Sequence, residues 1–168
     1  MKRYQSDEET RIKALSDFLK IKEDRIKVSE YDENLLLVDD SKDQFYVAVD
    51  DEDADKLARK NIEDTLWAFN SDFIAEHSSG IREAGERGVK ALQKMQEDLC
   101  ENANSIVKAL IDDMDDFVED AISADGRGHF ISSYDGEEYE QGDSYIYCID
   151  DKDSIEPDFD KEDDIERE

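Results

Sequence analysis

The chain has 168 residues, of which 49 are acidic and 21 basic, so its formal net charge is -28. This length suits one domain with some tail, and the 38% of apolar residues are enough for one core, which argues against a wholly disordered chain. No apolar run approaches the length of a membrane span, and the first residues lead into charged sequence rather than the apolar stretch of a secretory signal. So negative a charge repels nucleic acid and anionic membranes and favours basic surfaces.

The N-terminal region predicts a helix followed by a short strand. Ser6 is a candidate N-cap, with Glu9 three residues later completing a capping box, and apolar residues recur at helical spacing to about residue 21. The segment Arg25–Glu30 is a candidate strand. Two short apolar runs, 35–38 and 45–49, then flank the polar residues 39–44, a pattern typical of a β-hairpin.

The middle of the chain predicts helices. Asp50 or Asp51 caps a helix whose apolar face extends to Phe69 and includes Trp67 as a core residue. A short helical piece follows, beginning at Phe73 and ending near Gly80. Helical periodicity then predicts two longer helices, over about 81–101 and 103–123.

The C-terminal region predicts strands and then a tail. The sequence Asp125-Gly126-Arg127-Gly128 ends the last helix, and strands are expected near 129–133 and 145–149, with Asp135-Gly136 as a turn. Residues 150–168 hold eleven acids and three bases, and they are expected to form a mobile acidic tail.

The predicted fold class is therefore α+β. We expect a helical core of about four to five helices, a short hairpin near 35–49 and a small antiparallel strand region near 129–149. Residues 1–149 form one acidic domain in this interpretation, and 150–168 lie outside it.

The acidic residues are concentrated in three blocks. The net charge is -10 over residues 29–55, -9 over 97–125 and -13 over 135–168, and the rest of the chain is slightly basic. Adaptation to high salt is an alternative explanation of the acidity. It fits less well, because such proteins spread acid over the whole surface and use little lysine, whereas 13 of the 21 bases here are lysines.

The expected helix 103–123 carries the most informative acidic cluster. Only Lys108 is available to pair with these acids, so several carboxylates would repel each other at i,i+4 spacing, in the half of the helix where its dipole disfavours anions. A face that needed only solubility could alternate acids with lysines. The pattern favours a functional anionic face over a merely solvated one, and the candidate residues are Asp112, Asp113, Asp115, Asp116, Glu119 and Asp120.

A second candidate patch combines the hairpin turn with the start of the following helix. The turn contributes acids that have no capping role, whereas carboxylates in a first helical turn are stabilised by free N–H groups and the helix dipole. Structural and partner-binding interpretations of this patch therefore both stay open. Its residues are Asp39, Asp40, Asp43, Asp51, Asp53 and Asp55.

Other chemistries find little support. Cys100 and Cys148 have no CxxC spacing and indicate buried, reduced thiols. No calcium-loop, phosphate-loop or HExxH motif is present, and we expect no metal and no cofactor. A Ser–His–Asp grouping could be assembled around His129, but nothing in the sequence places its members together, so His129 is expected to be structural.

Three segments carry a resemblance to small proteins of bacteriophages and mobile elements. They are Leu66-Trp67-Ala68-Phe69-Asn70, the stretch from Ala121 to Phe130, and Tyr134-Asp135-Gly136-Glu137-Glu138. The resemblance covers about residues 50–149. It implies a bacterial or phage cytoplasmic setting, and it implies that the segment from His129 to Glu138 is a family feature.

In charge and size the chain also resembles DNA-mimicking inhibitors of the anti-restriction or anti-CRISPR type. The expected function is that of a non-enzymatic DNA mimic that binds and inhibits a basic DNA- or RNA-binding host protein, with no direct contact to nucleic acid or membrane. The alternatives are an accessory interaction module whose acidity serves solubility, and a small enzyme that uses the His129 segment. A homodimer is left open.

Overall fold

A computed structural model describes residues 7–29, 35–38 and 45–149 of the chain. The chain divides into two compact units, which are described separately. Unit 1 comprises the described residues up to Leu57 and from Arg127 onward, and unit 2 runs from Ala58 to Gly126. The acidic tail over 150–168 and the hairpin turn over 39–44 lie outside the described residues. The single domain over 1–149 stays a prediction.

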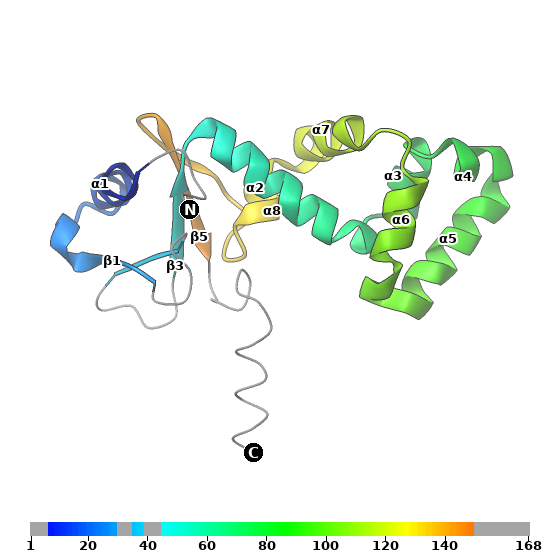
Figure 1. Ribbon diagram of the computed structural model, residues 1–168, viewed down its shortest axis with the longest axis horizontal. Coiled ribbons are helices and arrows are strands. Elements are labelled where there is room, and N and C mark those ends of the chain that lie inside the picture. Colours follow the sequence, from blue (N-terminus) through cyan, green and yellow to red (C-terminus); the bar gives the residue numbers. More distant parts are fainter. Residues whose placement is uncertain (1–6, 30–34, 39–44, 150–168) are drawn as a thin grey trace, which may run out of the picture. The chain divides into compact units, whose positions relative to one another are not determined.

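The α+β class is confirmed (Figure 1). The elements of unit 1 are α1 (Glu8–Leu19), η1 (Glu23–Arg25), β1 (Ile26–Val28), β2 (Leu36–Val38), β3 (Phe45–Val49), the start of α2 (Asp51–Asp64), α8 (Arg127–Ile131), β4 (Tyr139–Gln141) and β5 (Ser144–Ile149). Unit 2 contains the rest of α2, η2 (Leu66–Ala68), α3 (Ser71–Glu76), α4 (Ser79–Ala84), α5 (Glu86–Leu99), η3 (Cys100–Ala103), α6 (Asn104–Leu110) and α7 (Met114–Asp125).

Unit 1 is built on one five-stranded antiparallel sheet with the strand order β1-β2-β3-β5-β4. The predicted pairing of β2 with β3 is confirmed. The predicted C-terminal antiparallel strand region is confirmed as the β4–β5 hairpin. β5 also pairs with β3, from Phe45 opposite Ile149 to Val49 opposite Tyr145. The sheet therefore joins the two ends of the described chain.

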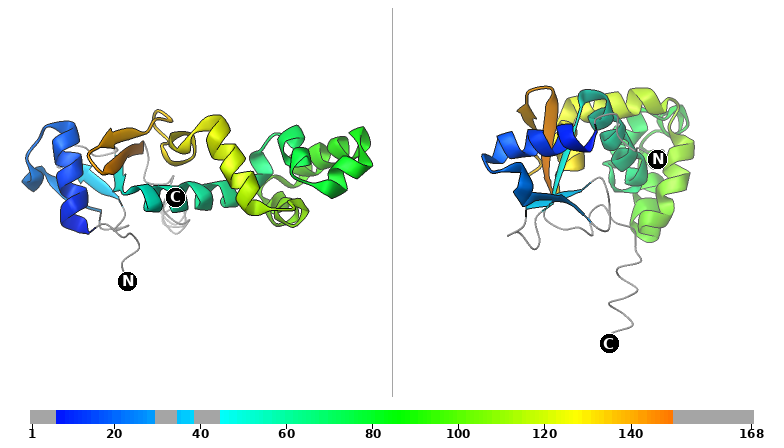
Figure 2. Two further views of the ribbon diagram at one scale, coloured as in Figure 1. Left: turned by 90° about the horizontal axis from the view of Figure 1, so that it is seen from above. Right: turned by 60° about the vertical axis from the view of Figure 1, so that its left-hand side comes forward.

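Helices cover both faces of this sheet. Ala14 and Leu15 of α1 pack against Tyr46, Ala48 and Ile146 on one face, and α1 crosses in front of the strands in the right-hand view of Figure 2. The other face is covered by α8 and the start of α2 (Figure 1). Every residue of β3 is buried, which fits a strand that is apolar on both faces.

Unit 2 is helical, and two side-chain amides hold its centre. Asn104 accepts from the N–H of Trp67 at 3.1 Å and donates to the carbonyl of Glu63 at 2.7 Å. Gln96 donates to the carbonyls of Trp67 and Phe69 at 2.8 and 2.7 Å. These bonds satisfy backbone groups that the short η2 turn leaves without helical partners. Trp67 is half-buried rather than a full core residue.

The helix predicted over 81–101 is divided at Gly85. This residue has φ 66° and ψ -147°, and its N–H bonds to the carbonyls of Ile81 and Arg82. An L side chain rarely adopts such a positive φ, so glycine allows the sharp turn between α4 and α5. The earlier helical piece also ends sooner than predicted, at Glu76.

The helix predicted over 103–123 is also wrong, because it is broken between α6 and α7. Ile111 has an extended backbone (φ -75°, ψ 124°) and a buried side chain. Asp113 then caps α7, since its carboxylate accepts from the N–H of Asp116 at 3.3 Å. Burial of Ile111 and a new N-cap outweigh the continuous helical periodicity. Asp115 and Asp116 consequently lie in the first turn of a helix, where the dipole favours anions.

Three smaller predictions are corrected. The N-cap of α1 is Asp7, whose carboxylate accepts from Thr10 N–H at 2.8 Å, rather than Ser6. The strand predicted over 129–133 is wrong, because 127–131 form α8 and the strand β4 begins only at Tyr139. Cys148 is buried as expected, but Cys100 is exposed.

Candidate interaction surface

The loop that precedes α7 is tied to the turn between α3 and α4. The N–H of Asp112 donates to the carbonyl of His77 at 2.9 Å. The Asp112 carboxylate accepts from the N–H of Ser79 at 2.9 Å and from its hydroxyl at 3.0 Å, and it lies 3.8 Å from Arg82. Asp113 is therefore the N-cap of α7, and Asp112 accepts hydrogen bonds from Ser79, the first residue of α4, whose own N-cap is Ser78.

Two further acids of α7 pair with bases from other helices of unit 2. Asp115 forms an ion pair with Arg59 of α2. Asp120 lies 3.1 Å from Nε2 of His77, whose ring packs edge-on against Phe117 at a centroid distance of 5.2 Å. These contacts orient the two carboxylates and connect α7 to α2 and α3.

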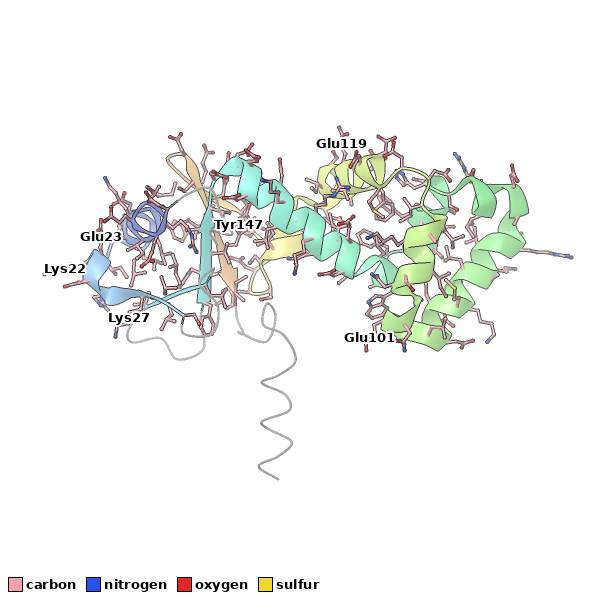
Figure 3. The ribbon with its side chains drawn as sticks, in the orientation of Figure 1. Lys22, Glu23, Lys27, Glu101, Glu119 and Tyr147 are labelled. Carbon is pink, nitrogen blue, oxygen red and sulfur yellow. The ribbon has the colours of Figure 1, made fainter. Side chains whose placement is uncertain are left out.

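Apart from the capping residue Asp113, the acids of the predicted face that make no ion pair in the described part of the chain are Asp116 and Glu119. Both are exposed, and Figure 3 shows Glu119 on the side of α7 that faces away from the other helices of this unit. Over Met114–Asp125 the helix contains no lysine or arginine. The structure thus retains an acidic face on α7, although on a shorter helix than predicted.

The pairing does not hide the other carboxylates. The side chains of Asp115 and Asp120 are still 78% and 61% exposed, and that of Asp112 is 47% exposed. We define the α7 surface as these exposed acids together with the two unpaired ones: Asp112, Asp115, Asp116, Glu119 and Asp120. Its carboxylates are accessible, and three of the five are held in position by contacts within unit 2.

The second candidate patch has a different character. Asp39, Asp40 and Asp43 lie outside the described residues. Asp50 is the cap of α2, with its carboxylate accepting from Asp53 N–H at 2.8 Å. Asp53 is buried, at 2% exposure.

Asp51 and Asp55 are both bound by one arginine. Arg127 donates from one terminal nitrogen to Asp51 Oδ1 at 2.9 Å and to Asp55 Oδ1 at 3.0 Å. It donates from Nε and the other terminal nitrogen to the two carboxylate oxygens of Glu138, at 2.8 and 3.0 Å. The α2 end of the patch is therefore built into the fold of unit 1, which favours the structural interpretation of these residues.

The surroundings of Arg127 strengthen this network. Its guanidinium lies 4.6 Å from the ring centroid of Tyr145, and the hydroxyl of Tyr147 donates to Glu138. Figure 3 shows Tyr147 on the side of β5 where α2 begins. Burial lowers the pKa of Arg127, but the bonds to Glu138 and Asp51 raise it above its usual value. Burial and the bond to Glu138 likewise raise the pKa of Tyr147. Both groups stay in their ordinary protonation states, so the network persists at neutral pH.

The Gly126–Glu138 segment is explained by this network. Gly126 ends α7 with φ 84°. A Cβ on Gly128 would lie 2.6–2.8 Å from backbone atoms of residues 136–138, so only glycine allows Glu138 to approach Arg127. The glycines thus give the segment a structural role that the sequence pattern alone left unexplained.

The loop between α8 and β4 is held by Asp135. Its carboxylate accepts from Ser132 at 2.8 Å, from the N–H of Glu137 at 3.0 Å and from the hydroxyl of Tyr139 at 2.6 Å. Burial raises the pKa of Asp135, but the hydrogen bonds from Tyr139, Glu137 and Ser132 outweigh it and lower the pKa overall. The bond to Asp135 raises the pKa of Tyr139 to about 12. The loop is therefore ordered by a charged hydrogen-bond acceptor.

The catalytic alternative gains nothing from this geometry. His129 is exposed on α8, with its ring against Phe130 at 5.0 Å, while the Ser132 hydroxyl lies 2.7 Å from the carbonyl of Cys148 and 2.8 Å from Asp135. Among the described residues no group of three His, Cys, Asp or Glu side chains could hold a metal ion. None of the helices described here has the length and apolar character needed to cross a membrane.

Comparisons with protein-family models, with curated proteins and with solved structures found no match to this chain. The α7 surface and the Arg127 network are therefore interpreted from their own geometry.

Proposed function

We propose that this protein is a non-enzymatic DNA mimic that binds and inhibits a basic, nucleic-acid-binding host protein, in the manner of anti-restriction or anti-CRISPR inhibitors. The observation that carries the proposal is the α7 surface. Five exposed carboxylates lie on or next to one helix without a lysine or arginine of that helix among them. The net charge of -28 adds long-range attraction to any basic cleft.

The contrast with the other long helices of unit 2 supports this interpretation. On α5, Lys90 pairs with Glu86 at 3.2 Å and Lys94 with Asp98 at 3.2 Å, each four residues apart. On α2, Lys60 pairs with Asp64 in the same way at 3.5 Å. Such alternating pairs are typical of a solvated helix face. The α7 surface departs from the pattern that the same chain uses elsewhere.

The spacing of the carboxylates also suits the proposal. Residues four apart on a helix rise by about 6 Å, and duplex phosphates on one strand advance by about 3.4 Å per step along the axis. Asp116 and Asp120 can therefore take the place of phosphates two steps apart. Because Arg59, His77 and Ser79 hold Asp115, Asp120 and Asp112 in position, little side-chain entropy is lost when a partner binds.

The test is a competition titration on a partner recovered from bacterial lysate. Duplex DNA should displace the protein from this partner, and rising salt should weaken the complex because screening acts within about 8–10 Å near physiological ionic strength. The double variant Asp116→Asn/Glu119→Gln should bind at least about tenfold more weakly, which corresponds to roughly 1.4 kcal/mol. It should fold normally, since neither side chain has a partner in the described structure.

The matched control is Glu86→Gln/Asp98→Asn on α5, which also removes two negative charges from unit 2. It should bind within about twofold of the wild type. Simultaneous binding of DNA and this protein to the partner, or equal loss in the two double variants, would show that the acidity of α7 serves only solubility.

A further inference from the structure

The sheet of unit 1 ends at β4, and no other strand in the described part of the chain pairs with the outer edge of β4. The β4–β5 hairpin has a two-residue loop that begins with Gly142 at φ 60°. In such a hairpin the residues that flank the loop exchange hydrogen bonds, and every second pair along the ladder does the same. Tyr139 and Gln141 therefore bond to β5, and the N–H and C=O groups of Glu140 point outward.

The charged residues of the chain around this edge are all acidic, apart from Arg127 before the segment. No lysine or arginine occurs between Gly128 and Ile149. Glu137, Glu140 and Asp143 are exposed and form no ion pair within the described ranges. An open strand edge flanked by three unneutralised carboxylates repels an acidic strand and attracts a basic one, so it selects for a basic segment.

Two exposed tyrosines lie in the same region. Tyr139 is 36% exposed, its ring packs against Phe18 at a centroid distance of 5.1 Å, and its hydroxyl is held by Asp135. Tyr134 is 61% exposed on the loop that precedes β4. Tyrosine is enriched at protein interfaces because it offers a large contact area with few rotatable bonds. Two contacts within unit 1 thus orient Tyr139 before any partner binds.

The carboxylate and aromatic groups near this hairpin already bind one arginine within unit 1. Within unit 1 the guanidinium of Arg127 is bound by two oxygens of Glu138 and lies against the ring of Tyr145. Glu140 is opposite Tyr145 in the ladder and two residues from Glu138, so it lies on the same face of the hairpin. Carboxylate and aromatic groups that recognise an internal arginine thus recur beside the open edge.

We propose that the outer edge of β4 binds an extended, arginine-bearing segment of a partner protein by strand addition. The backbone of the segment pairs with Glu140, an arginine of the segment on the same face of the sheet meets the Glu140 carboxylate, and the nearby carboxylates of Glu137 and Asp143 add to the attraction. Backbone pairing supplies affinity, and the side chains supply the preference for arginine. The surface is separate from the α7 surface, and loss of either one leaves the other intact.

The experiment uses the full chain and a synthetic peptide in which arginine alternates with threonine over eight residues. Binding is measured by calorimetry, and amide hydrogen exchange is followed by NMR. The Glu140 amide should become protected when the peptide binds. Glu140→Lys should weaken binding at least tenfold, whereas Glu76→Lys, the same charge change at an exposed position of α3, should stay within threefold of the wild type.

A second probe separates strand addition from simple charge attraction without changing the protein. The same peptide with N-methyl groups on alternate residues keeps its arginines but cannot complete the ladder, and it should lose binding. Equal binding of the methylated peptide, or an unprotected Glu140 amide, would overturn the proposal. Protection of this amide in the peptide-free protein, together with a dimer in sedimentation, would assign the edge to a second copy of the chain and would also overturn it.

Discussion

At the scale of single residues, one arginine connects two segments of unit 1 that are distant in the sequence. Arg127 contacts Asp51 and Asp55 of α2 and Glu138 of the segment before β4. Its side chain is only 11% exposed, so the three carboxylates neutralise a nearly buried charge. The neighbouring Gly128 makes this arrangement possible by leaving room for the backbone of residues 136–138.

This role of Gly128 predicts opposite effects for two glycine-to-alanine changes. Gly128→Ala should lower the free energy of unfolding by about 1–3 kcal/mol, because the new methyl group meets backbone that cannot move aside cheaply. Gly80→Ala should raise it by about 0.4–1 kcal/mol, because Gly80 is helical and has nothing within 4 Å of an added Cβ. Urea denaturation measures both. Equal effects of the two changes would show that Gly128 is not a close-approach site.

At the scale of elements, the break between α6 and α7 decides how the acidic segment is interpreted. A continuous helix would place Asp112, Asp113 and Asp116 on one face, where they would repel each other. In the structure Asp112 accepts the first N–H of α4, Asp113 caps α7 and Asp116 lies in the first turn of α7. The acids that seemed to destabilise one long helix therefore stabilise the starts of two separate helices.

The break can be tested by Asp113→Ala. Loss of the N-cap should lower the free energy of unfolding by about 1 kcal/mol. In a continuous helix the same change would instead stabilise the protein, because alanine has the highest helix propensity and one repulsive charge would be removed. Asp116→Asn is the control, and it should change stability by less than about 0.5 kcal/mol. A stabilised Asp113→Ala variant, measured by chemical denaturation, would contradict the structure.

At the scale of the whole molecule, the large net negative charge affects the stability of the folded state. Even if every lysine and arginine paired with one acid, the sequence would retain 28 negative charges. Their mutual repulsion destabilises any compact state and is reduced by dissolved salt. The charge that attracts a basic partner over a distance is thus a cost to the free protein.

We therefore expect the melting temperature to rise by several degrees when sodium chloride is raised from about 20 mM to about 300 mM, a range over which the screening length falls from roughly 20 Å to below 10 Å. Differential scanning calorimetry provides the measurement, and sucrose at equal osmolality is the control for effects unrelated to charge. A melting temperature that falls with salt would show that the ion pairs outweigh the net repulsion.

Local interactions are what the sequence by itself determined. The helix α1 (although not its N-cap), the start of α2 at Asp50 and the β2–β3 hairpin follow from neighbouring residues, and so does the concentration of acid in a few blocks. Periodicity and capping act over a few positions, so they can be recognised without the fold.

Only the tertiary structure decided which acids are paired, because their partners are distant in sequence. Arg127 is 76 residues from Asp51, and Arg59 is 56 residues from Asp115. The same holds for β5, which pairs with β3 although several helices lie between the two strands in the sequence. The break before α7 was equally hidden, because it involves burial of Ile111 and the contact of Asp112 with the α3–α4 turn, neither of which can be seen from neighbouring residues. These ion pairs, the strand pairing and the helix break depend on burial and contacts between segments that fold together. The local sequence pattern contains no information about which segments meet.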